Sequence, residues 1–94
     1  MVFDEQFSME ILQYGVGLMA DAGKYHFVAS LAQKNKIKQL CLSQRKDLAD
    51  RIPKKIKWFP DESCAIKALQ ENPKACHKCM RAIETLTLGY TPIK

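Results

Sequence analysis

Residues 36–57 read KIKQLCLSQRKDLADRIPKKIK, and this stretch decides which fold the sequence predicts. Its first part, residues 36–41, has the apolar spacing of a short helix. A turn is predicted at residues 42–43, and a second helix follows over residues 44–52, where Pro53 ends it. Two short helices joined in this way have the proportions of a helix-turn-helix motif.

The second of these helices predicts contact with DNA. Its apolar residues share one side, and its basic and amide residues share the other. Such side chains on an exposed helix suit contacts with phosphates and with base edges, and lysines continue the basic surface beyond the helix. The residues predicted to contact double-stranded DNA are Gln44, Arg45, Lys46, Arg51, Lys54, Lys55 and Lys57.

The charge is distributed unevenly along the 94 residues, whose net charge is +5. Residues 1–23 contain four acidic and no basic residues, whereas residues 24–60 contain ten basic residues against two acidic ones. Residues 61–94 are almost balanced, with five basic and four acidic residues. A local excess of this size favours an anionic partner, of which the phosphate backbone is the usual one. A solvated lysine-rich surface is the alternative.

The remaining chain also has the spacing of helices. Residues 1–23 predict one acidic helix that faces a partner, and a further helix begins near Lys24 in the basic segment 24–60. Residues 61–94 predict two helices, which start at Pro60-Asp61 and at Asn72-Pro73, the second ending at Gly89. Residues 54–59 alternate well enough for one short strand.

The predicted fold class is therefore all-α, a single small multi-helix domain over residues 1–94. The composition is that of a globular chain, with 47% apolar and 27% charged residues. No apolar stretch reaches the roughly 20 residues that span a bilayer, and the first residues lack a basic signal-peptide region. We expect a soluble, cytoplasmic protein without membrane contact.

From the basic segment onward the sequence resembles FlhD, the small subunit of FlhC/FlhD-type transcriptional activators. Residues 40–44 read LCLSQ and residues 48–50 read LAD, similar to that family's pattern of Leu-x-Leu-x-Gln, three residues, then Leu-Ala-acid. The aromatic pair Trp58-Phe59 follows at about the family's distance, and the resemblance covers residues 8–88. Further along, Asp61, Ile66 and Leu69 resemble residues of the family's next helix.

The resemblance implies a small helical bacterial subunit that joins a larger FlhC-like subunit. Together they would bind DNA upstream of promoters and activate transcription, with RNA polymerase as a further partner. Two features depart from the family. Ile56 stands where the family has a cysteine, so an intersubunit disulfide at that place is not supported, and the chain is shorter than usual for the family.

The first predicted helix indicates association with another subunit. Its apolar residues cover a wide arc, and the last helix adds a second apolar seam, more than a core of this size is expected to cover. Glycines on the first helix would let a partner helix approach closely. We expect a homodimer, a complex with an FlhC-like subunit, or both, through an interface that consists of Phe7, Ile11, Tyr14, Gly15 and Leu18.

The cysteines include one Cys-x-x-Cys pair, in residues 76–79. A zinc site needs four ligands, and Cys64, Cys76 and Cys79 with either His77 or Cys41 would supply them. This is the weaker alternative, because cysteines in such places are usually small buried hydrophobic residues. A thioredoxin-type centre is not favoured, because no βαβ pattern surrounds the pair. His26 has no catalytic partner near it in sequence, and no phosphate-binding glycine loop is present. We expect no enzyme activity, no metal and no cofactor.

These patterns predict a DNA-binding transcriptional regulator, the small FlhD-like subunit of a heteromeric activator. The alternative, from another functional class, is a small adaptor or inhibitor that binds an acidic protein surface and never touches DNA. The basic segment suits both, because carboxylates and phosphates attract the same lysines.

Overall fold

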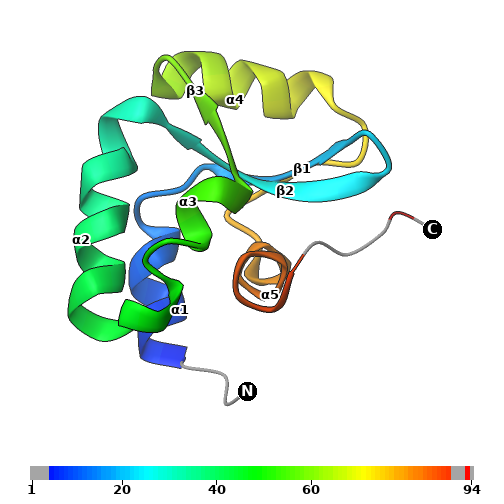
Figure 1. Cartoon of the computed structure of the whole chain (residues 1–94). Helices are drawn as coiled ribbons and strands as arrows, with labels where there is room; N and C mark the ends of the chain where they lie inside the picture. Colours follow the sequence, from blue (N-terminus) through cyan, green and yellow to red (C-terminus); the bar gives the residue numbers. More distant parts are fainter. Residues whose placement is uncertain (1–4, 90–92, 94) are drawn as a thin grey trace.

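The chain folds around a four-stranded mixed sheet (Figure 1), so the predicted all-α fold class is wrong. The computed structural model describes residues 5–89 and residue 93. The strands, in the sheet order β3-β2-β1-β4, are β1 (Gly17–Asp21), β2 (Lys24–Ser30), β3 (Ile56–Phe59) and β4 (Cys76–His77). The α-helices of this part of the chain are α1 (Glu5–Leu12), α2 (Lys34–Gln44), α3 (Ile52–Lys55), α4 (Glu62–Glu71) and α5 (Met80–Leu88). Two short 3-10 turns are η1 (Leu31–Gln33) and η2 (Lys46–Leu48).

The sheet combines one hairpin with one parallel crossover. Strands β1 and β2 are antiparallel, and the turn between them consists of Ala22 and Gly23, both with positive φ (51° and 78°). Two such residues give the turn whose twist matches that of the flanking strands. Strand β4 pairs antiparallel with the other edge of β1. Strand β3 pairs parallel with β2, so η1, α2, η2 and α3 together form the crossover between them.

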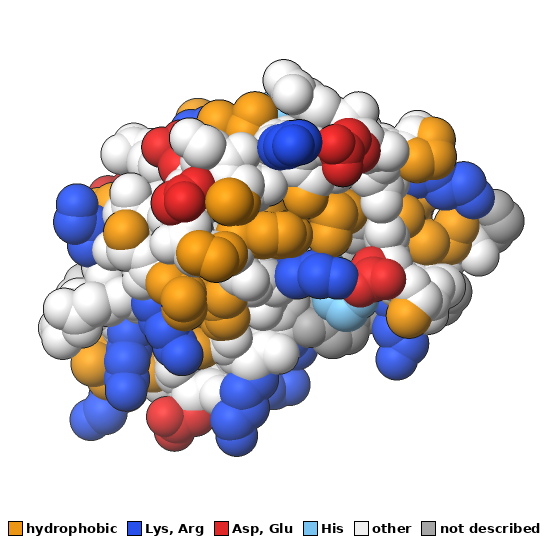
Figure 2. Space-filling view, turned by 90° about the horizontal axis from the view of Figure 1, so that it is seen from above, with side chains coloured by type: hydrophobic (Ala, Val, Ile, Leu, Met, Phe, Trp, Pro, Cys, Tyr) orange, Lys and Arg blue, Asp and Glu red, His pale blue; other side chains and the backbone are white. Residues whose placement is uncertain are grey.

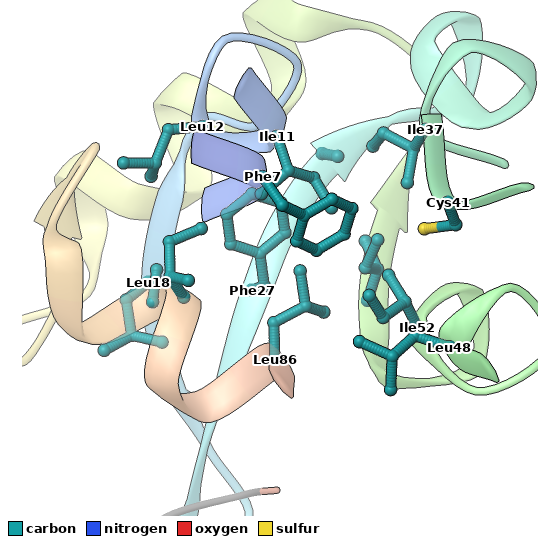
Figure 3. Close-up of a cluster of buried hydrophobic side chains, with 14 of the residues drawn as sticks. Phe7, Ile11, Leu12, Leu18, Phe27, Ile37, Cys41, Leu48, Ile52 and Leu86 are labelled. Atoms are coloured by element: carbon teal, nitrogen blue, oxygen red, sulfur yellow. The ribbon is translucent and has the colours of Figure 1, made fainter. Parts of the chain in front are cut away.

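Helices cover both faces of the sheet, α4 on one face and α1, α2, α3 and α5 on the other (Figure 1). In the central strands, Leu18 and Phe27 belong to the larger core cluster on the second face (Figure 3). Their neighbours Met19 and Val28 belong to the smaller cluster beneath α4. Strands that are buried on both faces lose the alternation of apolar and polar residues. The sequence of β1 and β2 therefore has no clear strand pattern, and its spacing was compatible with helices.

After α1 the single helix predicted for residues 1–23 is wrong, and so is the helix predicted to begin near Lys24, because these residues form β1 and β2. Residues 1–4 of the first predicted helix lie outside the described residues. The glycines at residues 15 and 17 make room for the sheet rather than for a partner helix. A Cβ atom at Gly15 would collide with the ring of Phe27, and one at Gly17 would collide with the backbone carbonyl of Cys76. These close approaches fix the path of the chain into β1 and the pairing of β1 with β4.

The predicted helix-turn-helix motif is also wrong. Helix α2 runs without a break through residues 42–43, where the turn was expected. The expected second helix, residues 44–52, is instead the 3-10 turn η2 followed by a further turn. Pro53 lies in the first turn of the four-residue helix α3, where its fixed φ favours a helix start rather than a helix end. The segment therefore lacks a recognition helix.

The C-terminal third confirms one predicted helix start and corrects the other. Asp61 caps α4, because its side chain accepts a hydrogen bond from the backbone N–H of Cys64 (2.8 Å). Asn72, where the other helix was predicted to start, instead follows the end of α4, where its side-chain amide donates to the carbonyl of Ala20 on β1 (2.7 Å). Helix α5 begins only at Met80.

Two smaller expectations are met nearby. The short strand expected within residues 54–59 is β3, and Gly89 ends the last helix with a φ of 119°. Among the described residues, no helix is both long and apolar enough to cross a bilayer.

Candidate nucleic-acid interface

The crossover between β2 and β3 concentrates the positive charge. Helix α2 has the sequence KNKIKQLCLSQ and contains no acidic residue. Its Ile37 and Cys41 are fully buried in the core, whereas Lys34, Lys36 and Lys38 are exposed. Figure 2 shows lysine and arginine side chains gathered along the lower left of the surface, the side on which α2 lies in Figure 1. The apolar spacing of α2 thus turns its lysines toward solvent.

Three of the lysines surround one shallow hollow between α2 and α3. Lys34 and Lys38 contribute from α2, where a separation of four residues puts them on the same side of the helix. Lys54 contributes from α3, and Asp50 is the acidic residue of the lining. The hollow has a volume of about 190 Å³ and is completed by Ala49 and Pro53. Three ammonium groups against one carboxylate make it a site of positive potential.

The single tryptophan is fixed beside this hollow. The Lys34 ammonium lies 5.6 Å from the centre of the Trp58 ring, which is within the range of a cation–π contact. The indole N–H of Trp58 donates a hydrogen bond to the carbonyl of Pro53 (3.0 Å). Both partners line the hollow, so the half-buried indole holds one lysine and one wall of the hollow in place.

Of the seven residues predicted to contact DNA, three are engaged within the chain. Gln44 donates to Glu10 on α1, and Lys57 pairs with Asp21 at the end of β1. Arg45 makes two hydrogen bonds to Asp47, at 3.2 and 3.1 Å. These contacts lower the pKa of Asp21 and of Asp47, through Lys57 and Arg45 respectively.

The other four predicted residues lie on η2, α3 and the turn between them. Lys46, Arg51 and Lys54 are exposed, and Lys55 is half-buried. Burial lowers the pKa of Lys55, and the nearby positive charge of Arg51 lowers it further. An anion bound beside Lys55 and Arg51 would relieve that repulsion. Of the predicted set, Lys54 alone lines the hollow.

The sequence interpretation missed the lysines of α2. Lys34 lies just before the predicted motif, and Lys36 and Lys38 lie in its first helix, in a run that contains no acidic residue; this was the available signal. A second hollow, of about 440 Å³, lies on another side of α2 and is lined by Lys36 together with polar side chains. Its complete lining is Tyr14, Asn35, Lys36, Gln39, Leu40 and Ser43.

The residues expected at a subunit interface lie inside this chain. Phe7, Ile11 and Leu18 belong to the larger core cluster, with exposed fractions of 0%, 0% and 2%. Gly15 is buried, and Tyr14 is half-buried against the same cluster. The apolar seam of α1 is therefore covered by elements of the chain itself, and association with a second subunit stays a prediction.

The predicted ligands of the alternative zinc site do not form a cluster. Among the described residues, no three His, Cys, Asp or Glu side chains lie close enough together to hold a metal ion. Cys64 is exposed on α4, apart from the Cys76 and Cys79 pair beside α5. Comparisons with protein-family models, with curated proteins and with solved structures find no match to this chain.

Proposed function

We propose that this protein binds nucleic acid by its phosphate backbone, with double-stranded DNA in the cytoplasm as the first candidate. The observation that supports this most is the convergence of Lys34, Lys38 and Lys54 on one hollow, opposed there by Asp50 alone. Ammonium groups on two rigid helices, four residues apart on one of them, suit contact with successive phosphates.

The proposal concerns backbone contact rather than reading of base sequence. The segment expected to enter the major groove is a 3-10 turn, so direct readout has no helix that supports it. Trp58 adds a rigid aromatic group beside the lysines, which favours contact with unpaired bases in addition to duplex. A place in a transcriptional activator remains a hypothesis, and copurification with an FlhC-like subunit would test it.

The test measures DNA binding by fluorescence anisotropy at several salt concentrations. A protein that uses three or more lysine–phosphate contacts should show a slope of log K against log salt of about −3 or steeper. The triple variant Lys34→Glu, Lys38→Glu, Lys54→Glu should lose binding at moderate salt. The matched control reverses Lys67, Lys74 and Lys78, which are equally exposed but lie on and after α4.

The control distinguishes a site from general attraction. Both triple variants change the net charge by the same amount, so equal losses of affinity would contradict the proposal. Binding without salt dependence would also contradict it. An acidic polypeptide that binds more tightly than DNA, and that the first triple variant no longer binds, would favour the adaptor alternative instead.

A further inference from the structure

The Cys-x-x-Cys segment forms a tight turn between β4 and α5. Cys76 is the first residue of β4, and Cys79 is the residue that precedes the first turn of α5. Between them Lys78 adopts a positive φ of 47°, a conformation that few residues other than glycine take. The chain bends at this residue, between the strand that begins with Cys76 and the helix that Cys79 precedes.

The two cysteines lie near each other at this turn. Both side chains are half-buried, and they are not joined by a disulfide. Burial, and then the neighbouring Cys79, raise the pKa of Cys76 to about 11. Cys76 therefore holds its proton, so the first nucleophilic attack is assigned to Cys79.

The turn is anchored on β1. The backbone N–H of Lys78 donates to the carbonyl of Val16 (3.0 Å), and His77 is paired with Gly17 in the sheet. At Gly17 the strand comes so close to Cys76 that a side chain would not fit. The backbone that carries the two cysteines is thus fixed by the sheet, which keeps the reacting groups near each other before any reaction starts.

The other two cysteines are placed differently. Cys41 is fully buried, and burial raises the pKa of its thiol to about 11. Cys64 is exposed on α4, where a hydrogen bond from its thiol to Asp61 raises its pKa. Within the described part of the chain no third metal ligand joins the pair, and two ligands fill only half of a tetrahedral zinc site.

We propose that Cys76 and Cys79 form a reversible dithiol–disulfide pair that exchanges with small disulfides of the glutathione class. The Cys79 thiolate attacks one sulfur of glutathione disulfide, which breaks its S–S bond and releases one glutathione thiolate. The Cys76 thiol then loses its proton and attacks the mixed disulfide at the Cys79 sulfur. This step forms the Cys76–Cys79 bond and releases the second glutathione, so the protein loses two electrons and two protons.

This pair is independent of the proposed nucleic-acid site. The sheet order puts β4 at one edge and β3, with its neighbouring lysines, at the other. Oxidation should therefore leave the affinity for DNA unchanged within about twofold, in line with the near-additivity of distant sites.

The test treats the folded protein with mixtures of glutathione and glutathione disulfide, blocks free thiols with an alkylating reagent and weighs the products. We expect a loss of two hydrogen masses at the pair. Trypsin cleaves after Lys78, so residues 75–78 and residues 79–81 should stay joined until they are reduced. Cys64 is the internal control, because a thiol that has no second cysteine beside it forms only a mixed disulfide with glutathione. The pair should be oxidised at a glutathione disulfide fraction roughly tenfold lower than Cys64 requires.

Two variants complete the test. Cys76→Ser should leave Cys79 trapped as the glutathione adduct, whereas Cys64→Ser should not change the response of the pair. Circular dichroism checks that each variant is folded. The proposal is overturned if Cys76 and Cys79 each take up glutathione in the unaltered protein, if both stay open to alkylation in glutathione disulfide, or if either is joined to Cys64.

Discussion

The contact between Gly15 and Phe27 leads to a prediction about stability that a pair of substitutions can test. Gly15→Ala puts a methyl group where the Phe27 ring lies. The ring is fully buried in the larger core cluster (Figure 3), so it can move only by displacing other core side chains. Overpacking of this kind costs about 1–3 kcal/mol, and the direct collision with ring atoms places the expected cost of Gly15→Ala near 2–3 kcal/mol.

Phe27→Leu removes most of the ring and should cost about 1–2 kcal/mol, less than truncation to alanine. In the double variant the added methyl group occupies the space that the ring leaves. The double variant should therefore cost about 1–2 kcal/mol, rather than the sum of the two single costs. The difference corresponds to a coupling energy of about 2 kcal/mol between the two sites.

Urea unfolding followed by the fluorescence of the single tryptophan, Trp58, gives each free energy of unfolding. The control is Gly23→Ala in the hairpin turn, where nothing lies within 4 Å of the added Cβ and the positive φ alone sets a cost of about 1 kcal/mol. Combined with Phe27→Leu, this control should be additive. If Gly15→Ala and Phe27→Leu also add within about 0.5 kcal/mol, the reasoning from packing is refuted.

Two further predictions concern polar groups. Stability should fall as the pH drops below about 4, because hydrogen bonds from Lys57, Arg45 and the backbone of Cys64 lower the pKa values of Asp21, Asp47 and Asp61 in the folded state. A group whose folded pKa is lowered stabilises the protein above its unfolded pKa and ceases to do so as the pH falls through the folded value. Thermal unfolding at pH 3 and pH 6 measures this loss of stability. If the Asp61→Asn variant shows a smaller difference in melting temperature between the two pH values, the Asp61 cap of α4 contributes to it. In α5 the buried Thr85 hydroxyl has no hydrogen-bond partner among the described residues, whereas the Thr87 hydroxyl donates to the carbonyl of Ile83 (2.8 Å). Thr85→Val should therefore stabilise the protein by about 1 kcal/mol and Thr87→Val should destabilise it by about as much, and equal shifts in the melting temperature would contradict this account.

The sequence predicted best the features that depend on neighbouring residues. The helix start at Pro60-Asp61 and the helix end at Gly89 both follow from local chemistry, and both are observed. The helix-turn-helix prediction failed because Ser43 is compatible with a helix interior as well as with a turn, and Pro53 with a helix start as well as an end. Only the packing of the crossover on the sheet decides between these roles.

The candidate site was predictable in charge but not in shape. The excess of lysines marked the segment 24–60, yet the hollow forms where α2 and α3 meet across sixteen to twenty residues of chain. The strands were hidden for a related reason. Met19 and Val28 are buried only because α4, forty residues later, covers that face of the sheet.

The short outer strands of the sheet have a consequence for behaviour at high concentration. The long apolar strands β1 and β2 lie in the middle, whereas β3 has four residues and β4 has two. In the described part of the chain, no strand pairs with the outer edge of either. An unpaired edge is a template for strand addition by another molecule, and a short edge offers few hydrogen bonds to an incoming strand. The apolar strands β1 and β2 are thus kept away from the sheet edges, where β-pairing between molecules begins. We expect the protein to resist such pairing when it is concentrated.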